Sequence, residues 1–245
     1  MNAMQPPRRV GTLIPCLNTV IETEFNRILP RHYQLHAGRL RMGPIDEVGW
    51  RMQDADIDYQ AELLGSAKVE LIILAQTAVS FFDLGYDAAV KARITKSSGA
   101  PALTGGEITA RAAVALGLRR VALLSPYGDA LNELGRIYYQ SLHGLEVQAT
   151  GTFGRPRDSG EVSQIPTEAA ADAMRRADTR DIEGFIVAGG NFPSMHAIAD
   201  WERQFGKPVI TTNQSAMWAI FCRLGGADRL SGYGTLLELM PGQPG

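Results

Sequence analysis

The chain contains 245 residues, of which 45% are hydrophobic and 20% are charged, a composition typical of a globular protein with a substantial core. Its formal net charge is −2 and it has no cluster of Lys and Arg, which argues against nucleic acid as a partner. No apolar stretch approaches the roughly 18 residues of a membrane span, so we expect no membrane partner and a cytoplasmic location.

The composition also limits the chemistry of any site. The chain has two cysteines, Cys16 and Cys222, and neither has a spacing typical of zinc ligands. The four histidines are scattered along the sequence. We therefore expect no disulfide framework and no metal site.

The first half of the chain alternates short apolar runs with segments of helical spacing. Its first strand, over 10–15, ends in a turn from Pro15 to Thr19, where Asn18 or Thr19 can cap a helix that begins near Val20. The further elements predicted in this half are strands over 36–42, 69–76 and 101–104 and helices over 54–68, 88–97 and 107–116.

The second half shows the same alternation. The elements predicted there are strands over 120–125, 146–150, 184–188 and 208–211, a helix that 126–132 opens, and helices over 167–177, 194–205 and 215–224. Between two of them, residues 151–166 contain glycines, prolines and mixed charges without periodicity, so we expect a long loop. This loop is either a solvated connection or a lid over a cleft.

The two halves are related by an internal repeat. Ala75 and Ala188 end similar apolar runs, 188 − 75 = 113 residues apart. The flanking pairs of similar segments are 10–15 with 121–126 and 99–104 with 206–211. Three landmarks in the same order indicate two copies of one α/β unit.

The repeat predicts an α/β fold with two pseudosymmetric flavodoxin-like lobes, each built on a parallel four-stranded sheet. We expect the first lobe over 1–117, the second over 118–224, and a tail over 225–245 that returns to the first lobe. Ligands bind such sheets at the carboxyl ends of the strands, so an active-site cleft is expected between the lobes.

The predicted strand ends carry neutral hydrogen-bond donors. Thr77 and Tyr127 offer hydroxyl groups, and Gly189 and Gly190 leave backbone N–H groups accessible near a helix start, which suits a carboxylate or an enolate oxygen. Each of these residues also has a structural interpretation as a cap, a core residue or a turn. Three asparagines that are equally common in turns lie at or beside strand ends: Asn18, Asn191 and Asn213.

These segments resemble the aspartate/glutamate racemase superfamily, in particular its branch of arylmalonate decarboxylases and maleate cis–trans isomerases, over nearly the whole chain. The segments that carry the resemblance are 15–19 with Glu22 and Glu24, Thr77 with 80–81, Tyr127 with 132–133, 189–190 and 232–234. The resemblance implies that Asn18 holds a substrate carboxylate and that Thr77, Tyr127, Gly189 and Gly190 form an oxyanion hole. It also implies a small carboxylate substrate, no cofactor and a homodimer.

The chain departs from that superfamily where the resemblance places two catalytic cysteines. Gln76 and Ala188 occupy those positions, and neither can act as a nucleophile or a proton carrier. We therefore expect no two-base racemisation and no thiolate addition to a double bond. Cys16 and Glu107 are the candidates for the missing proton donor, and Asp83 is a weaker one.

The leading hypothesis is a cofactor-independent enzyme that acts on a small carboxylic or dicarboxylic acid through an enolate-like intermediate. A second hypothesis is a hydrolase or lyase in which Gln76 orients a water molecule and Glu107 activates it. The third is a catalytically inactive carboxylate-binding protein that keeps Asn18, Asn191 and the other donors.

Overall fold

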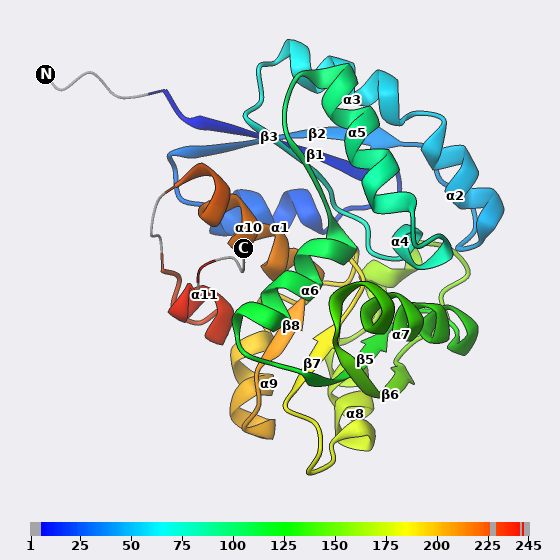
Figure 1. The fold of residues 1–245 in the computed structure, drawn as a ribbon. Helices are drawn as coiled ribbons and strands as arrows, with labels where there is room; N and C mark the ends of the chain where they lie inside the picture. The colour runs from blue at the N-terminus through cyan, green and yellow to red at the C-terminus, as the bar shows by residue number, and fades with distance from the viewer. Residues whose placement is uncertain (1–5, 226–228, 241, 243–245) are drawn as a thin grey trace, which may run out of the picture.

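The computed structural model describes residues 6–225, 229–240 and 242, which form two parallel four-stranded sheets with helices around them (Figure 1). The strand order is β2-β1-β3-β4 in the first sheet and β6-β5-β7-β8 in the second, which confirms the predicted pair of pseudosymmetric α/β lobes. The strands are β1 (Arg8–Pro15), β2 (Tyr33–Leu40), β3 (Leu71–Leu74), β4 (Ala102–Thr104), β5 (Arg120–Ser125), β6 (Glu146–Thr152), β7 (Gly184–Val187) and β8 (Val209–Thr211).

Helices connect successive strands of each sheet, as parallel pairing requires. They are α1 (Ile21–Ile28), α2 (Glu47–Asp54), α3 (Ile57–Ser66), α4 (Val79–Phe82), α5 (Tyr86–Ser98), α6 (Gly105–Ala115), α7 (Asp129–His143), α8 (Thr167–Ala177), α9 (Ile198–Phe205), α10 (Thr212–Leu224) and α11 (Thr235–Leu239), with a short 3-10 helix η1 (Glu161–Gln164). None of the helices in the described ranges has the length and apolarity that crossing a membrane requires.

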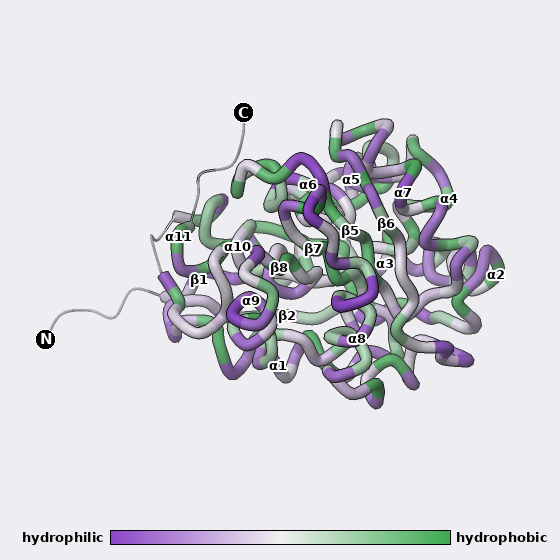
Figure 2. The backbone as a smooth tube through the Cα atoms, turned by 90° about the horizontal axis from the view of Figure 1, so that it is seen from below, coloured by the Kyte–Doolittle hydropathy of each residue, from purple (hydrophilic) through white to green (hydrophobic). Residues whose placement is uncertain are grey.

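The central strands form the interior of each lobe. All four residues of β3 and all four residues of β7 are buried, because both faces of a parallel sheet are covered. Figure 2 shows hydrophobic residues along β5 and β7 and hydrophilic residues on the outer helix α9. The continuous apolar runs in the sequence therefore correctly predicted these buried strands.

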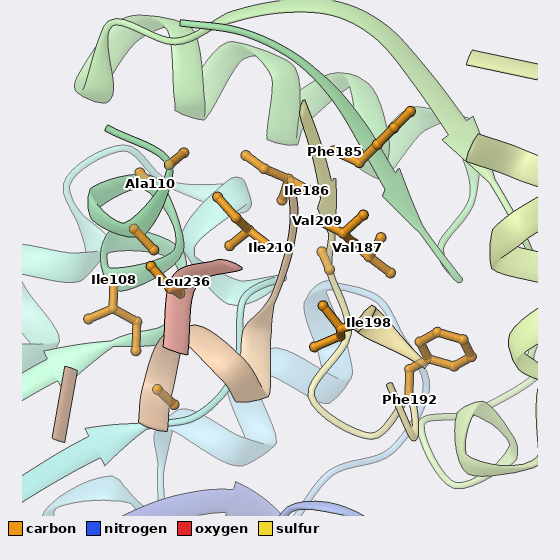
Figure 3. Close-up of a cluster of buried hydrophobic side chains, with 14 of the residues drawn as sticks. Ile108, Ala110, Phe185, Ile186, Val187, Phe192, Ile198, Val209, Ile210 and Leu236 are labelled. Carbon is orange, nitrogen blue, oxygen red and sulfur yellow. The ribbon is translucent and has the colours of Figure 1, made fainter. Parts of the chain in front are cut away.

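Helices α6 and α10 pack between the lobes. Helix α6 follows β4 of the first sheet but packs against β8 and α10, and α10 follows β8 but packs against β3 and α6. Figure 3 shows Ile108 and Ala110 of α6 in the same apolar cluster as Ile186 and Ile210 of the second sheet. One core cluster therefore spans both lobes, and whether residues 1–117 fold as a separate domain stays a prediction.

The predicted helix over 54–68 is wrong in its boundaries. The segment contains α3, which begins at Ile57, whereas α2 (Glu47–Asp54) precedes it and was not predicted. The Asp46 side chain accepts a hydrogen bond from Gly49 N at 3.0 Å and caps α2. The sequence analysis missed this start because Gly49 lies in the first turn of α2 and glycine is a poor helix former.

Three other predicted boundaries also shift. Strand β2 occupies 33–40 rather than 36–42, because its pairing with β1 from Arg8↔Tyr33 to Pro15↔Leu40 sets its ends. Helix α9 begins four residues later than predicted, after turns at 189–192 and 194–197. Helix α10 begins at Thr212 rather than Ser215, because Thr211 and Gln214 form a capping box there.

The described part of the tail contacts helices of the second half of the chain. Gln214 Nε2 of α10 donates to Tyr233 O at 2.7 Å, and Thr235 N and Oγ1 both donate to Glu202 Oε2 of α9 at 2.8 Å. Helix α11 buries Leu236 and Leu237 next to α10. Over 233–239 the tail thus contacts α9 and α10, while Gly225 O accepts a hydrogen bond from Tyr33 Oη of β2 at 2.8 Å. The return of 225–245 to the first lobe stays a prediction.

A buried carboxylate joins the two lobes. Glu24 of α1 is 9% exposed and accepts hydrogen bonds from Met195 N at 3.0 Å and from Asn213 Nδ2 of α10 at 2.7 Å. Loss of hydration raises the pKa of the Glu24 carboxyl to about 7, and the bonds from Asn213 and Met195 oppose this only in part. The charged form of Glu24 therefore costs folding free energy near neutral pH.

We predict that Glu24→Gln changes the free energy of unfolding more favourably near pH 7 and above than it does below about pH 4. Below about pH 4 the carboxyl is protonated in both the folded and the unfolded chain, so its pKa difference contributes nothing. As the pH rises towards 7, only the unfolded chain loses this proton, which lowers the free energy of unfolding of the wild type by up to about 3 kcal/mol. Urea unfolding of both proteins across this range measures the change, and a difference between them that is constant with pH would contradict it.

Candidate active site

The carboxyl ends of β1, β3, β5 and β7 meet at one small cavity with a volume of about 30 Å³. Each of the four predicted strand-end segments contributes to its wall, and the loops after β2 and β6 complete it. The lining residues are Pro15, Asn18, Met42, Ile45, Ala75, Gln76, Ala78, Tyr127, Ser159, Val162, Gly190 and Asn191. Lys, Arg and His are absent from this lining among the described residues, so any anion bound here is held by neutral donors.

Asn18 caps a helix, as its position in the sequence predicted, and it also lines the cavity. Its Oδ1 accepts hydrogen bonds from Val20 N and Ile21 N, each at 3.0 Å, and so caps α1. These two donors fix the orientation of the amide and leave Nδ2 without a partner among the described residues. Because Asn18 also lines the cavity, its Nδ2 is available to a carboxylate.

The loops after β3 and β7 present backbone N–H groups. Ala75 N donates to Leu13 O and Ala188 N donates to Leu124 O, at 3.0 Å and 2.8 Å, and these bonds end the pairing of the two strands. In the described structure, no residue accepts a hydrogen bond from the N–H groups of the residues that follow, which are Gln76, Thr77, Ala78, Gly190 and Asn191. Buried N–H groups without protein acceptors are suited to bind an anion.

Thr77 and Gly189 are joined through a residue that the sequence analysis did not select. Thr77 Oγ1 lies 2.9 Å from Thr212 Oγ1, and Gly189 N donates to Thr212 Oγ1 at 3.2 Å. Thr77 and Gly189 therefore do not face each other across the cleft as expected, and neither lines the cavity. They instead fix the two loops, while the adjacent Gln76, Ala78 and Gly190 reach the cavity.

Glycine is required at 189 and 190 for different reasons. Gly189 has a φ of +124°, which side chains disfavour. At Gly190 an added Cβ would lie 3.0 Å from Ala75 O and 3.2 Å from Ile21 Cδ1. The absence of a side chain at Gly190 thus allows the two strand-end loops to approach each other.

Tyr127 separates the cavity from an outer recess of about 510 Å³, and both are lined by Tyr127 and Ile45. The tyrosine is 9% exposed, and its hydroxyl has no hydrogen-bond partner within the described ranges. Burial raises the pKa of the Tyr127 phenol above its usual value, so the hydroxyl remains a neutral donor. This supports the predicted interaction with substrate oxygens.

Gln76 has a buried acceptor without a partner. Its Nε2 lies 3.5 Å from Met42 Sδ, whereas its Oε1 is buried and has no hydrogen bond to any described residue. Such an acceptor costs folding free energy unless a ligand or a water molecule donates to it. Gln76 is thus the group best placed to hold a water molecule or a hydroxyl in the cavity.

Neither candidate proton donor from the sequence analysis reaches the cavity. Cys16 is exposed, and its Sγ lies 4.0 Å from Met42 O outside the lining. The Glu107 carboxylate pairs with Lys91 and, at 3.2 Å, with Arg111, in a separate surface recess. The sequence correctly placed Glu107 at a helix start but not the direction of its side chain, which faces α5. Both assignments are corrected.

The loop after β6 covers the cavity. Asn191 Nδ2 donates to Ser159 O at 2.6 Å, and Asn191 Oδ1 accepts from Thr19 N at 2.9 Å, so one side chain connects this loop to the turn after β1. A bridge between Pro44 and Asp158 joins the loop to the first lobe as well. Residues 153–166 therefore occupy the position of the lid that the sequence suggested.

The described residues contain no group of three or more His, Cys, Asp and Glu side chains that could hold a metal ion. The two cysteines also lie away from the cavity, since Cys222 is half-buried within α10. The chemistry of this site is therefore that of amides, hydroxyl groups and one glutamine.

The comparisons with known proteins agree with this arrangement. A family model described as arylmalonate decarboxylase matches residues 10–237. The chain belongs to the arylmalonate decarboxylase family. This confirms the resemblance to the branch of arylmalonate decarboxylases and maleate isomerases.

Curated relatives cover nearly the whole chain. A maleate isomerase of Pseudomonas putida is 28% identical, over 94% of this chain and 97% of its own length. An arylmalonate decarboxylase of Bordetella bronchiseptica is 25% identical, with 94% and 96% covered. Among solved structures, the maleate isomerase of Pseudomonas putida S16 has a TM-score of 0.88 and 26% identity, with 95% of this chain and 98% of that chain covered.

We predict that Asn191→Ala loosens the lid without unfolding the protein. The substitution removes the hydrogen bonds to Ser159 O and from Thr19 N, so amides in 153–166 should exchange with deuterium about 10-fold faster, as expected for loss of roughly 1.4 kcal/mol. Hydrogen exchange read by mass spectrometry measures this, and Asn26→Ala, at an exposed position of α1, is the control. Unchanged exchange in 153–166 would show that Asn191 does not hold the loop.

Proposed function

We propose that this protein is a cofactor-independent enzyme that acts on a small carboxylic or dicarboxylic acid through an enolate-type intermediate. The observation that carries the proposal is the set of neutral donors at one buried cavity: unpaired loop amides, Asn18 Nδ2 and the Tyr127 hydroxyl. Family membership supports it, because the relatives named above are a lyase and an isomerase of carboxylic acids.

The donors are suited to the transition state more than to the substrate. When an enolate forms, negative charge concentrates on the oxygens of the carboxylate that remains bound, and fixed donors then bind it more tightly. Tyr127 stays protonated because burial raises its pKa, so it can donate throughout the reaction. A Lys or Arg would bind the starting carboxylate more strongly and gain less in the transition state.

The lack of a thiol at the cavity favours decarboxylation over isomerisation. A mutant of the Nocardia farcinica maleate isomerase, 25% identical to this chain, has been solved with a covalently bound succinylcysteine intermediate, whereas Gln76 and Ala188 occupy the two strand ends here. Decarboxylation of a malonate-type acid needs no nucleophile. The C–C bond breaks, CO₂ leaves, and the electron pair remains as an enediolate that takes up one proton.

A water molecule bound to Gln76 is the proposed source of that proton. Gln76 Oε1 and Ser159 Oγ are the buried unpaired acceptors among the described lining residues, and the carboxylate of Glu107 and the thiol of Cys16 lie elsewhere. The water gives its proton to the carbanion carbon, and the resulting hydroxide combines with CO₂ or takes a proton from solvent. Gln76→Leu should therefore reduce turnover, while Cys16→Ala and Glu107→Gln should retain it.

We predict that Tyr127→Phe lowers turnover about 10²- to 10³-fold, the usual effect of losing one oxyanion donor, with a smaller change in KM. Tyr59→Phe is the matched control, because Tyr59 is 62% exposed and far from the cavity lining. ¹H NMR of malonate, phenylmalonate and maleate in D₂O with each enzyme identifies the substrate and the deuterated product. Equal turnover by the wild type and Tyr127→Phe would show that the hydroxyl does not act on the substrate.

A second candidate is a hydrolase or lyase in which the water on Gln76 attacks the substrate. The unpaired Gln76 Oε1 favours it, because a glutamine acceptor can orient the attacking water. The site has no nearby carboxylate base to activate that water, since Glu107 is ion-paired in another recess. Incorporation of ¹⁸O from solvent into the product distinguishes this reaction from decarboxylation. A carboxylate-binding protein would show thermal stabilisation by malonate without any product.

A further inference from the structure

Glu24 is a buried carboxylate that lies outside the cavity lining but is connected to it by a short chain of hydrogen bonds. Asn213 Nδ2 donates to Glu24 Oε2 at 2.7 Å and also to Gly190 O at 3.2 Å. Both N–H bonds of this amide are thereby used, and Asn213 Oδ1 is buried without a partner in the described structure. Gly190, in turn, lines the cavity.

We propose that Glu24 is a positioning residue whose protonation state sets, through Asn213, the orientation of the peptide between Gly190 and Asn191. This inference rests on the proposed function only where it concerns turnover. The relay itself is a property of the fold, because it links α1 of the first lobe to α10 and to the loop after β7.

The planarity of the peptide bond explains how a distant carboxylate reaches the cavity. In a trans peptide the C=O of one residue and the N–H of the next point in opposite directions. Asn213 Nδ2 holds the Gly190 carbonyl, so the Asn191 N–H is directed away from α10, and no described residue accepts a bond from it. A change at Glu24 that moves the Asn213 amide therefore rotates a donor available to the substrate.

Two states of Glu24 differ in what Asn213 can do. The charged carboxylate accepts from Nδ2, as observed. The neutral carboxyl can instead donate to Asn213 Oδ1, the unpaired acceptor, after the amide turns over. Because that rotation withdraws Nδ2 from Gly190 O, protonation releases the Gly190 carbonyl.

The surroundings of Glu24 set where this change occurs. Arg27 of the same helix, His196 of the loop before α9 and Tyr233 of the tail line the recess next to it, and Asn213 and Met195 N are its neutral partners. Within the described ranges Glu24 forms no ion pair with Arg27 or His196. Burial consequently dominates and raises the pKa of Glu24 to about 7.

The first half of the chain lacks such a relay. In the repeat offset of 206 − 99 = 107 residues, Asn213 corresponds to Gly106, which has no side chain. An added Cβ at Gly106 would lie 2.8 Å from the Tyr138 hydroxyl and 2.9 Å from Ser80 Oγ, so no larger residue fits. The amide link that Asn213 provides therefore has no counterpart at Gly106 in the first half.

NMR of the full-length protein tests the relay without an enzyme assay. In wild-type protein the ¹³C′ shift of Gly190 and the ¹⁵N shift of Asn191 should titrate with a midpoint at about pH 7. In Glu24→Gln both titrations should disappear, and in Glu62→Gln, where the carboxylate is exposed and makes no side-chain contact, they should persist. Asn213→Ala keeps the carboxylate but removes the link, so Gly190 should no longer titrate; it also decides the matter if Glu24→Gln does not fold.

Turnover supplies a separate test. With the acid identified by product analysis, Glu24→Gln should remove the pH dependence of kcat with midpoint about 7 and change KM less than threefold. A Gly190 shift that is flat in the wild type, or that titrates equally in Glu24→Gln, would overturn the relay. If the wild type turns over none of the acids, the proposed function fails, while the NMR titration still decides the role of Glu24.

Discussion

Four buried polar residues at the start of α10, 211–214, connect different parts of the molecule. Thr211 and Gln214 form the capping box, and Gln214 also binds the tail at Tyr233 O. Thr212 joins the loops after β3 and β7, and Asn213 joins α1 to Gly190. Buried polar groups are stable only when they are hydrogen-bonded, so this helix start fixes the relative positions of its partners.

The position of α10 between the sheets explains why the cavity is small. Helix α6 of the first half packs against β8, and α10 of the second half packs against β3. Apolar side chains of both lobes therefore form one core below the strand ends. The loops above that core approach closely at Gly190 and Ala75. A ligand in this space is surrounded by amides and apolar side chains, where hydrogen bonds are stronger than in solution.

The two halves share their architecture but differ in chemistry. Gly105 and Gly106 stand where Thr212 and Asn213 stand in the second half, so the polar links come from α10 alone. Ion pairs of Glu107 with Lys91 and Arg111 stabilise the corresponding helix start of the first half from outside. The structural repeat therefore supports a single site with two unlike walls, as a reaction with a directed proton transfer requires.

The sequence by itself determined the strands, their order in two repeated units, and the four strand ends that meet at the cavity. Buried parallel strands need continuous apolar runs, and a repeat of such runs is visible without a structure. Asn18, Gln76, Tyr127, Gly190 and Asn191 were found because they directly follow those strands.

Only the tertiary structure decided which side chains reach the cavity and which hold the loops. Glu107 lies in the first turn of α6, where side-chain direction changes by about 100° per residue, and it faces a separate surface recess. Cys16 directly follows β1 and is exposed. Thr212 and Glu24 act through contacts over 135 and 189 residues of sequence, which no local pattern reports. The sequence predicted where the cavity lies. The packing of α10 between the lobes determined which side chains reach the cavity and which hold the loops.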